Sequence, residues 1–194
     1  MALDATINCF EPLTAERLFQ WHSALFLTGR DEWGHRLRVG DWRDDAGGRM
    51  EIVSGAFGHE KVHYVAPPAE HLDAEMSAFL EWFNGSQDLD PLVKGAIAHL
   101  WFVAIHPFGD GYGRITRAIA DMTLARSGGG AQRLYSMSAA IERSRSGYYE
   151  VLQSVTAKDA IDITTWIQWF IDRLGNAVGD ALSTLDNVML KNDF

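Results

Sequence analysis

Two apolar helical patterns meet at a short glycine-bearing loop, and this arrangement most limits how the chain can fold. Asp90-Pro91 is typical of an N-cap followed by the first residue of a helix, and apolar residues continue at helical spacing as far as His106. A second pattern begins at Arg114 and stops at the three glycines 128–130. The apolar side of this second pattern consists of Ile115, Ala118, Ile119, Met122 and Leu124. The sequence therefore predicts two helices joined through residues 106–113.

Helical spacing recurs through most of the chain. Thr14 stands at the start of one pattern as a capping residue, and further patterns cover about 73–84, 139–155 and 163–190. No Ser-, Pro- or Gly-rich linker interrupts the 194 residues, a length that is sufficient for one sizeable core. We therefore expect a mainly α protein with a single domain over residues 1–194.

Residues 50–65 are the exception to the helical pattern. The β-prone pairs Ile52-Val53 and Val62-His63, the second continued by Tyr64 and Val65, flank a tip with glycines at 55 and 58. This pattern predicts a β-hairpin. From these residues alone, a hairpin that only covers the core is as good an interpretation as one that acts as a flap over a binding site.

The loop between the two central helices has the composition of an anion site. Gly111 and Gly113 can adopt φ > 0, so that successive N–H groups point inward as a nest. The second helix is predicted to begin directly behind them, and its dipole favours the same negative charge. Arg114 and Arg117 are three residues apart on one face of that helix, as polyphosphate recognition prefers.

Two further side chains of the loop suggest a reaction. Asp110 could hold Mg²⁺, which proteins usually bind through only one or two carboxylates. His106 has a side chain that titrates near neutrality and could take a proton from an attacking hydroxyl. Taken singly, each of these residues is more often structural, but their combination at this spacing indicates phosphoryl or nucleotidyl transfer to a hydroxyl.

Other catalytic and metal-binding motifs are absent from the sequence. It has no dinucleotide fingerprint, no G-x-x-x-x-G-K-[ST], no H-E-x-x-H and no G-x-S-x-G. His59, His63 and His71 lie near one another, but no cysteine or acid stands at ligand spacing. We therefore interpret them as surface histidines rather than a zinc site.

Charge and cysteine content limit the partners and the compartment. The formal net charge of −9 argues against nucleic acid or an anionic membrane as a partner. Residues 114–145 nevertheless carry six arginines and only two acids, so the local charge there suits an anionic ligand. Cys9 is the only cysteine, so an internal disulfide is excluded. The sequence shows neither a signal peptide nor a membrane span, and we expect a cytoplasmic protein.

At residues 106–117 the chain resembles the Fic family (filamentation induced by cAMP). The family motif H-P-F-x-[D/E]-G-N-G-R-x-x-R matches at every fixed position except Tyr112. The likeness extends over nearly the whole chain, and longer bacterial Fic proteins share similar segments. These segments are 13–22, 39–43, 53–55, 62–67 and 148–149.

The resemblance implies a helical Fic fold, with an active-site loop and helix at 106–127 and a flap at about 50–65. It also implies transfer of AMP from ATP, with Mg²⁺, to a Ser, Thr or Tyr hydroxyl of another protein. His106 would be the general base and Asp110 the Mg²⁺ ligand. Residues 111–113 would form the anion nest. Arg114 would clamp the phosphates and Arg117 would contact the terminal phosphate. A target segment would add to the edge of the flap at Ile52, Val53, Val62 and His63.

Two departures from the family leave alternatives open. Tyr112 replaces an asparagine that tolerates left-handed backbone and can contact phosphate, which allows weak, altered or absent activity. A catalytically impaired nucleotide- or partner-binding protein is therefore the alternative, as is a relative that transfers another phosphate-linked group or removes AMP. Many relatives carry an inhibitory helix with the pattern [S/T]-x-x-x-E-[G/N], and no segment of this sequence matches it. The nearest segment is Ser138–Glu142, which is followed by Arg143 where the pattern requires Gly or Asn. The inhibitor would then be an upstream domain or an antitoxin-like partner, unless Arg117 is unrestrained. A homo-oligomer also remains open.

Overall fold

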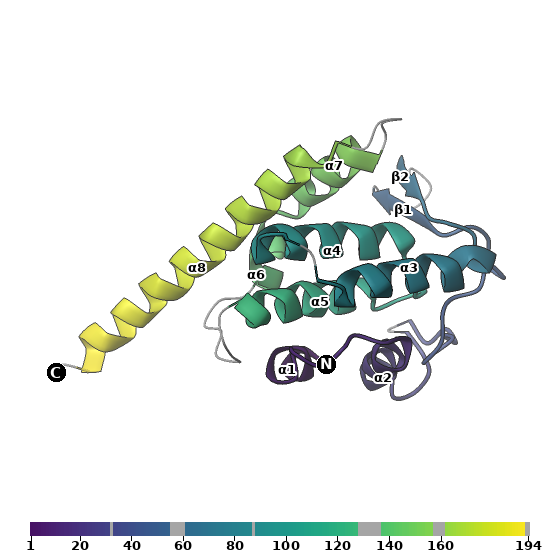
Figure 1. Cartoon of the computed structure of the whole chain (residues 1–194), viewed down its shortest axis with the longest axis horizontal. Coiled ribbons are helices and arrows are strands. Elements are labelled where there is room, and N and C mark those ends of the chain that lie inside the picture. The colour runs from purple at the N-terminus through teal and green to yellow at the C-terminus, as the bar shows by residue number, and fades with distance from the viewer. Residues whose placement is uncertain (32, 55–60, 87, 128–136, 157–161, 193–194) are drawn as a thin grey trace. The chain divides into compact units, whose positions relative to one another are not determined.

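The computed structural model of the chain (Figure 1) describes residues 1–194 except 32, 55–60, 87, 128–136, 157–161 and 193–194. It divides into two compact units, Met1–Gly130 and Ala131–Phe194, and each is described by itself. Helices dominate both units, so the expected mainly α fold is confirmed. Among the described helices, none combines the length and the apolar character needed to cross a membrane. The expectation of one domain over the whole chain stays a prediction.

The first unit contains five α-helices, a β-hairpin and a short 3-10 helix in its described part. In chain order they are α1 (Ala2–Ile7), α2 (Ala15–Leu25), β1 (Glu51–Ser54), β2 (Lys61–Val65), η1 (Ala69–His71), α3 (Leu72–Asn84), α4 (Pro91–Ile105) and α5 (Tyr112–Ser127). The second unit contains α6 (Met137–Arg143), α7 (Arg145–Thr156) and α8 (Thr164–Asn192).

The predicted helix starts agree with the capping contacts. The Thr14 hydroxyl accepts the N–H of Arg17 at 3.2 Å and caps α2. The Asp90 carboxylate accepts the N–H of Leu92 at 2.8 Å, with Pro91 as the first residue of α4. Because these caps act within three residues, the sequence was sufficient to predict where both helices begin.

The core of the first unit forms around α4 and α5, which lie side by side with α3 along them (Figure 1). A row of buried phenylalanines connects these elements. The ring centroids of Phe83 and Phe79 on α3 are 5.8 Å apart, Phe79 is 5.6 Å from Phe102 on α4, and Phe102 is 6.4 Å from Phe108 in the loop. Aromatic packing at these separations anchors the loop between α4 and α5 to the core.

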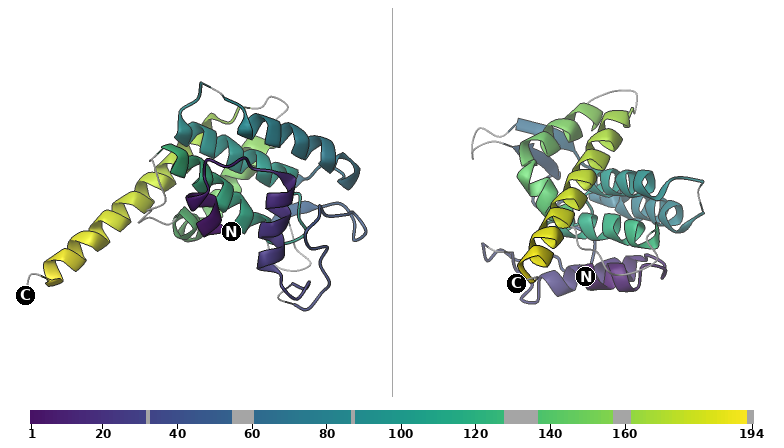
Figure 2. Two further views of the ribbon diagram at one scale, coloured as in Figure 1. Left: turned by 60° about the horizontal axis from the view of Figure 1, so that its bottom comes forward. Right: turned by 90° about the vertical axis from the view of Figure 1, so that its left-hand side faces the viewer.

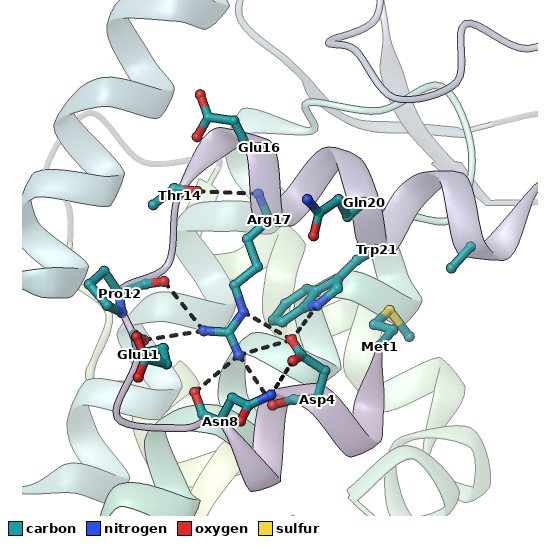
Figure 3. Close-up of a pocket in the computed structure, with 11 residues that line it drawn as sticks. Met1, Asp4, Asn8, Glu11, Pro12, Thr14, Glu16, Arg17, Gln20 and Trp21 are labelled. Carbon is teal, nitrogen blue, oxygen red and sulfur yellow. Dashed lines mark hydrogen bonds and ion pairs between the residues drawn. The ribbon is translucent and has the colours of Figure 1, made fainter.

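Arg17 connects α1 to α2 at the margin of this unit (Figure 3). Its guanidinium is paired with the Asp4 carboxylate at 2.9 Å and donates to the backbone carbonyls of Asp4, Asn8, Glu11 and Pro12 at 3.1–3.3 Å. These residues line a surface hollow of about 580 Å³. Because its polar groups are largely occupied by one another, we interpret the hollow as a structural joint.

The hairpin expected at 50–65 is present. β1 and β2 pair antiparallel, with Ile52 opposite Tyr64, Val53 opposite Val62, and an irregularity between the two pairs. Figure 1 shows the hairpin at the same end of the unit as the turn from α4 into α5. The glycine-bearing tip of the expected hairpin lies outside the described residues.

The second unit has an aromatic core. Trp166 and Phe170 of α8 are buried, and the Tyr148 ring on α7 lies 6.0 Å from Trp166 and 5.7 Å from Trp169 between centroids. Figure 2 shows α8 as one continuous helix.

The expectation of one helix over about 139–155 was wrong. The helix ends at Arg143, and a new one begins at Arg145. Ser144 between them accepts the Tyr148 N–H on its carbonyl at 2.9 Å and a guanidinium N–H of Arg173 on its hydroxyl at 3.0 Å. The partner of the Ser144 hydroxyl on α8 is 29 residues away, so helical spacing along the chain does not predict the break.

Candidate active site

The turn from α4 into α5 contains two residues with left-handed backbone. His106 is the C-cap of α4, with φ 50° and ψ 59°, and it is the one non-glycine residue with positive φ in the described part of the chain. Gly111 has φ 75°, and its carbonyl accepts the N–H groups of Arg114 and Ile115 at 3.0 and 3.1 Å. The two residues reverse the chain, so that α4 ends beside the beginning of α5.

The expected nest differs from the observed turn in two respects. The helix begins at Tyr112 rather than at Arg114, and Gly113 lies within its first turn without a positive φ. One left-handed glycine at Gly111 is sufficient to start the helix, so Gly113 takes helical backbone. A Cβ on Gly113 would lie 3.5 Å from Nη1 of Arg117, which is an ordinary contact distance, so this position tolerates a side chain.

His106 is buried under Tyr112. His106 is only 3% exposed, and its Nδ1 has no hydrogen-bond partner. The centroids of the His106 and Tyr112 rings are 3.6 Å apart, and the ring planes make an angle of 39°. Burial and, to a smaller extent, the positive charge of Arg43 lower the pKa of His106 from 6.5 to about 3. The imidazole is therefore neutral at pH 7, as a proton acceptor must be.

His22 hydrogen-bonds the loop between α4 and α5 from α2, and no motif in the sequence predicts this role. Its Nδ1 accepts the N–H of Gly40 at 3.3 Å, so Nε2 carries the proton and donates to the carbonyl of Asp110 at 3.1 Å. The ring stacks on Phe108 with centroids 4.2 Å apart. The available signal was a histidine four residues after Leu18, on the buried side of α2.

Asp110, Arg114 and Arg117 surround the start of α5. Asp110 is half-buried, and its Oδ1 accepts the N–H of Gly111 at 2.5 Å. Arg114 is exposed, with its Cζ 5.0 Å from the centroid of the Phe26 ring. Arg117 is half-buried and helps burial to lower the pKa of His99 to about 3. The two guanidinium groups therefore stand at the N-terminal end of α5, where the helix dipole favours an anion.

The four flap residues named from the sequence are only partly described. Their backbones lie in β1 and β2, and Val62 is 45% exposed, whereas the side chains of Ile52, Val53 and His63 lie outside the described part of the structure. Among the described hydrogen bonds, two from the Arg43 side chain connect the segment after β2 to the turn between α4 and α5. One goes to the carbonyl of Pro67 and the other to the carbonyl of His106.

Comparison with known proteins supports the interpretation of the motif. The model of the Fic/DOC family matches residues 12–124, which is more than half of the chain. Two similar curated proteins are protein adenylyltransferase fic-1 of Caenorhabditis briggsae, 36% identical over 96 residues, and protein adenylyltransferase Fic of Drosophila willistoni, 33% identical over 113 residues. The alignments cover 48% and 56% of this chain but only 18% and 22% of those proteins.

Solved structures agree with the fold. A Fic family protein from Desulfovibrio desulfuricans G20 superposes with a TM-score of 0.71 at 28% identity, covering 88% of this chain and 47% of its own. Fic-1 of Caenorhabditis elegans, at 18% identity, shares the fold with a TM-score of 0.66, covering 96% of this chain and 51% of its own. The match of the family model across the motif and the described turn shows that this chain belongs to the Fic/DOC family.

Proposed function

We propose that the chain is an AMP transferase that moves AMP from ATP to a Ser, Thr or Tyr hydroxyl of a target protein. The observation that supports this function best is that a neutral, buried His106 at the end of α4 adjoins the N-terminus of α5, which carries Arg114 and Arg117. Relatives that carry the name protein adenylyltransferase support the same reaction.

The N-terminal turn of α5 is the proposed phosphate site. The first N–H groups of a helix have no carbonyl partner within it, and the dipole adds positive potential at this end. Residues 111–113 would place these N–H groups around the phosphates. Arg114 would clamp the phosphates, and Arg117 would contact the terminal phosphate, as two forked cations three residues apart can do.

His106 is the proposed general base. The hydroxyl oxygen of the target attacks the α-phosphorus of ATP, a new O–P bond forms, and the bond from the α-phosphorus to the bridging oxygen breaks to release pyrophosphate. The hydroxyl proton passes to the neutral imidazole. Bound phosphates place negative charge beside His106, which raises its pKa from the low value of the free protein toward neutrality.

Asp110 fits Mg²⁺ as its single protein ligand. In the part of the chain that the structure describes, no three His, Cys, Asp or Glu side chains form a metal-binding group. Mg²⁺ is usually held by one or two carboxylates together with phosphate oxygens and water, so one half-buried carboxylate beside the phosphate site is suitable. The ion supplies charge neutralisation on the phosphates.

The hairpin is the proposed docking edge for the target. In the described residues the sheet has only two strands, so each strand has an outer edge that an extended segment can join. We propose Ile52, Val53, Val62 and His63 as the residues that receive it.

Tyr112 favours a second candidate, a catalytically impaired Fic protein that binds a nucleotide or a partner. Its ring centroid lies 3.6 Å from that of His106, so the base is covered from the side of α5. A target hydroxyl can reach the imidazole only if this ring moves. AMP transfer would therefore require that the Tyr112 ring rotates away from His106.

Intact-mass analysis tests both candidates. The wild type, His106→Ala, Tyr112→Asn and Tyr112→Phe are incubated with Mg²⁺ and ATP, alone and with host lysate, and labelled proteins are identified by the added mass of AMP. We expect transfer by the wild type and none by His106→Ala. Tyr112→Asn should be faster by about tenfold or more, since general-base catalysis contributes about 10²–10⁴-fold. Tyr112→Phe keeps the ring and serves as the matched control.

Three results would change this conclusion. Equal labelling by His106→Ala refutes the base assignment. Transfer by Tyr112→Asn but not by the wild type supports the impaired protein. An added mass other than AMP with a different donor, or loss of AMP from a pre-labelled target, assigns the loop to another phosphate-linked group or to AMP removal.

A further inference from the structure

A buried arginine lies in the long connection between α2 and β1. Of the described residues 27–50, only Trp42 and Arg43 are buried, and the side chain of Arg43 is 3% exposed. A buried guanidinium is costly unless its donors are satisfied, and burial lowers its pKa while the Asp45 charge opposes this change. The hydrogen-bond acceptors of Arg43 therefore show which parts of the fold residues 27–50 stabilise.

The donors of Arg43 reach three separate segments. Nε donates to the carbonyl of His106 at 2.8 Å, Nη2 donates to the carbonyl of Pro67 at 2.5 Å, and Nη1 pairs with the Asp45 carboxylate. The other oxygen of Asp45 accepts the N–H of Ala69 at 2.7 Å. The side chain thus connects the proposed base to the chain that leaves the hairpin.

The backbone of Arg43 adds a second contact to the same loop. Its N–H donates to the carbonyl of Pro107 at 2.9 Å, so two consecutive carbonyls after α4 bond to one residue. Carbonyls at the end of a helix lack helical partners, and a cation there is favourable for the helix dipole.

His106 needs such support because of its backbone conformation. Left-handed backbone is unfavourable for an L-residue, and it persists only where surrounding contacts impose it. The contacts to His106 and Pro107 fix the peptide groups on the carboxyl side of the base. They therefore fix the direction in which the imidazole points.

We propose that Arg43 is a positioning residue that sets the orientation of His106 and couples it to residues 66–69, the segment by which the chain leaves the hairpin. A target segment that joins the hairpin would order this exit and, through Arg43, the backbone of the base. The inference rests on the proposed function, because AMP transfer is the reaction in which His106 would act as the base. Arg43 would act through the backbone of His106, without itself touching the substrate.

Four variants test the coupling. Arg43→Met removes the side-chain donors, Arg43→Lys keeps the charge but lacks the fork, and Asp45→Asn keeps an acceptor for Ala69 but loses the ion pair. Arg17→Met is the matched control, since Arg17 also joins one carboxylate to several backbone carbonyls, at α1 and α2. Asp45→Asn remains informative if Arg43→Met does not fold.

The kinetic result separates positioning from general stability. We expect kcat for AMP transfer to fall about 100-fold in Arg43→Met, with KM for ATP little changed, because a misplaced catalytic group costs about this much. Arg43→Lys should not restore the rate. Asp45→Asn should reduce kcat less, and Arg17→Met should lower the unfolding temperature while leaving kcat unchanged. Equal kcat losses in Arg43→Met and Arg17→Met, or parallel loss of ATP affinity, would overturn the proposal.

Amide hydrogen exchange gives a readout that needs no activity. We expect Arg43→Met to speed exchange in peptides covering both 61–70 and 106–112, Asp45→Asn to speed it in 61–70, and Arg17→Met to do neither. Unchanged exchange at 106–112 in folded Arg43→Met or Arg43→Lys would overturn the coupling. If the wild type transfers no AMP, the proposed function fails, and hydrogen exchange decides the linkage by itself.

Discussion

Gly111 is the position where one added methyl group should damage the active-site turn most. Its φ is 75°, and a Cβ there would lie 2.7 Å from Cε2 of Phe26 and 3.3 Å from Cδ1 of Leu25. Phe26 is only 7% exposed, so its ring has little space to move. Both the backbone and the packing therefore oppose any side chain at this position.

The two effects can be expressed as free energies. Left-handed backbone costs an alanine about 1–2 kcal/mol, and overpacking of a buried site adds about 1–3 kcal/mol. We expect Gly111→Ala to lower the free energy of unfolding of the first unit by ~2–5 kcal/mol. A domain is typically stable by about 5–15 kcal/mol, so this loss should be easy to measure.

Two neighbouring glycines serve as controls. A Cβ on Gly109 has no atom within 4 Å and the residue has no positive φ, so Gly109→Ala should change the free energy of unfolding by less than about 0.5 kcal/mol. Gly113 lies in the first turn of α5, and Gly113→Ala should stabilise the helix by up to ~1 kcal/mol.

Urea unfolding of the full chain, followed by circular dichroism, measures the three variants. Adding Phe26→Leu to Gly111→Ala should recover part of the loss, because a smaller side chain relieves the contact but not the backbone strain. If Gly111→Ala unfolds with the same free energy as Gly109→Ala, the left-handed turn against Phe26 is wrong.

Two further predictions concern buried histidines. His22→Phe keeps an aromatic ring but leaves the Asp110 carbonyl and the Gly40 N–H without their partner. It should lower the free energy of unfolding by about 1–3 kcal/mol and slow AMP transfer. An unchanged free energy of unfolding would contradict these hydrogen bonds. The pKa values of His99 and His106 are lowered from 6.5 to about 3 in the folded protein. Between pH 6.5 and about 3 the unfolded chain therefore binds more protons than the folded one, and the free energy of unfolding should fall as the pH falls through this range. Urea titrations at several pH values should show a weaker dependence in His99→Gln, and a slope equal to that of the wild type would refute the shift.

Local sequence signals predicted much of the fold. Thr14 and Asp90-Pro91 mark helix starts through contacts within three residues, and the β-prone runs on each side of the hairpin tip predict its two strands. The twelve-residue motif also predicted that His106 and the start of α5 would be close, since only a short turn separates them. The break at Ser144 was missed because its partner Arg173 lies on another helix.

The supports of the site could not be predicted in this way. Arg43 is 63 residues from His106, and His22 is 88 residues from Asp110, so no spacing rule connects either pair. Phe26 likewise affects Gly111 only because α2 ends against the loop. Each of these contacts depends on which distant segments pack together.

The order of residues is enough to establish which chemical groups line the turn between α4 and α5, because helix caps, glycine turns and helical spacing act between near neighbours. The burial, protonation and hydrogen bonding of those groups depend on the folded chain. It buries His106 beneath Tyr112, lowers its pKa through lost hydration, and connects its carbonyl through Arg43 to the chain beyond the hairpin. Burial and electrostatic interaction depend on every segment that surrounds a side chain, and these segments come together only when the chain has folded.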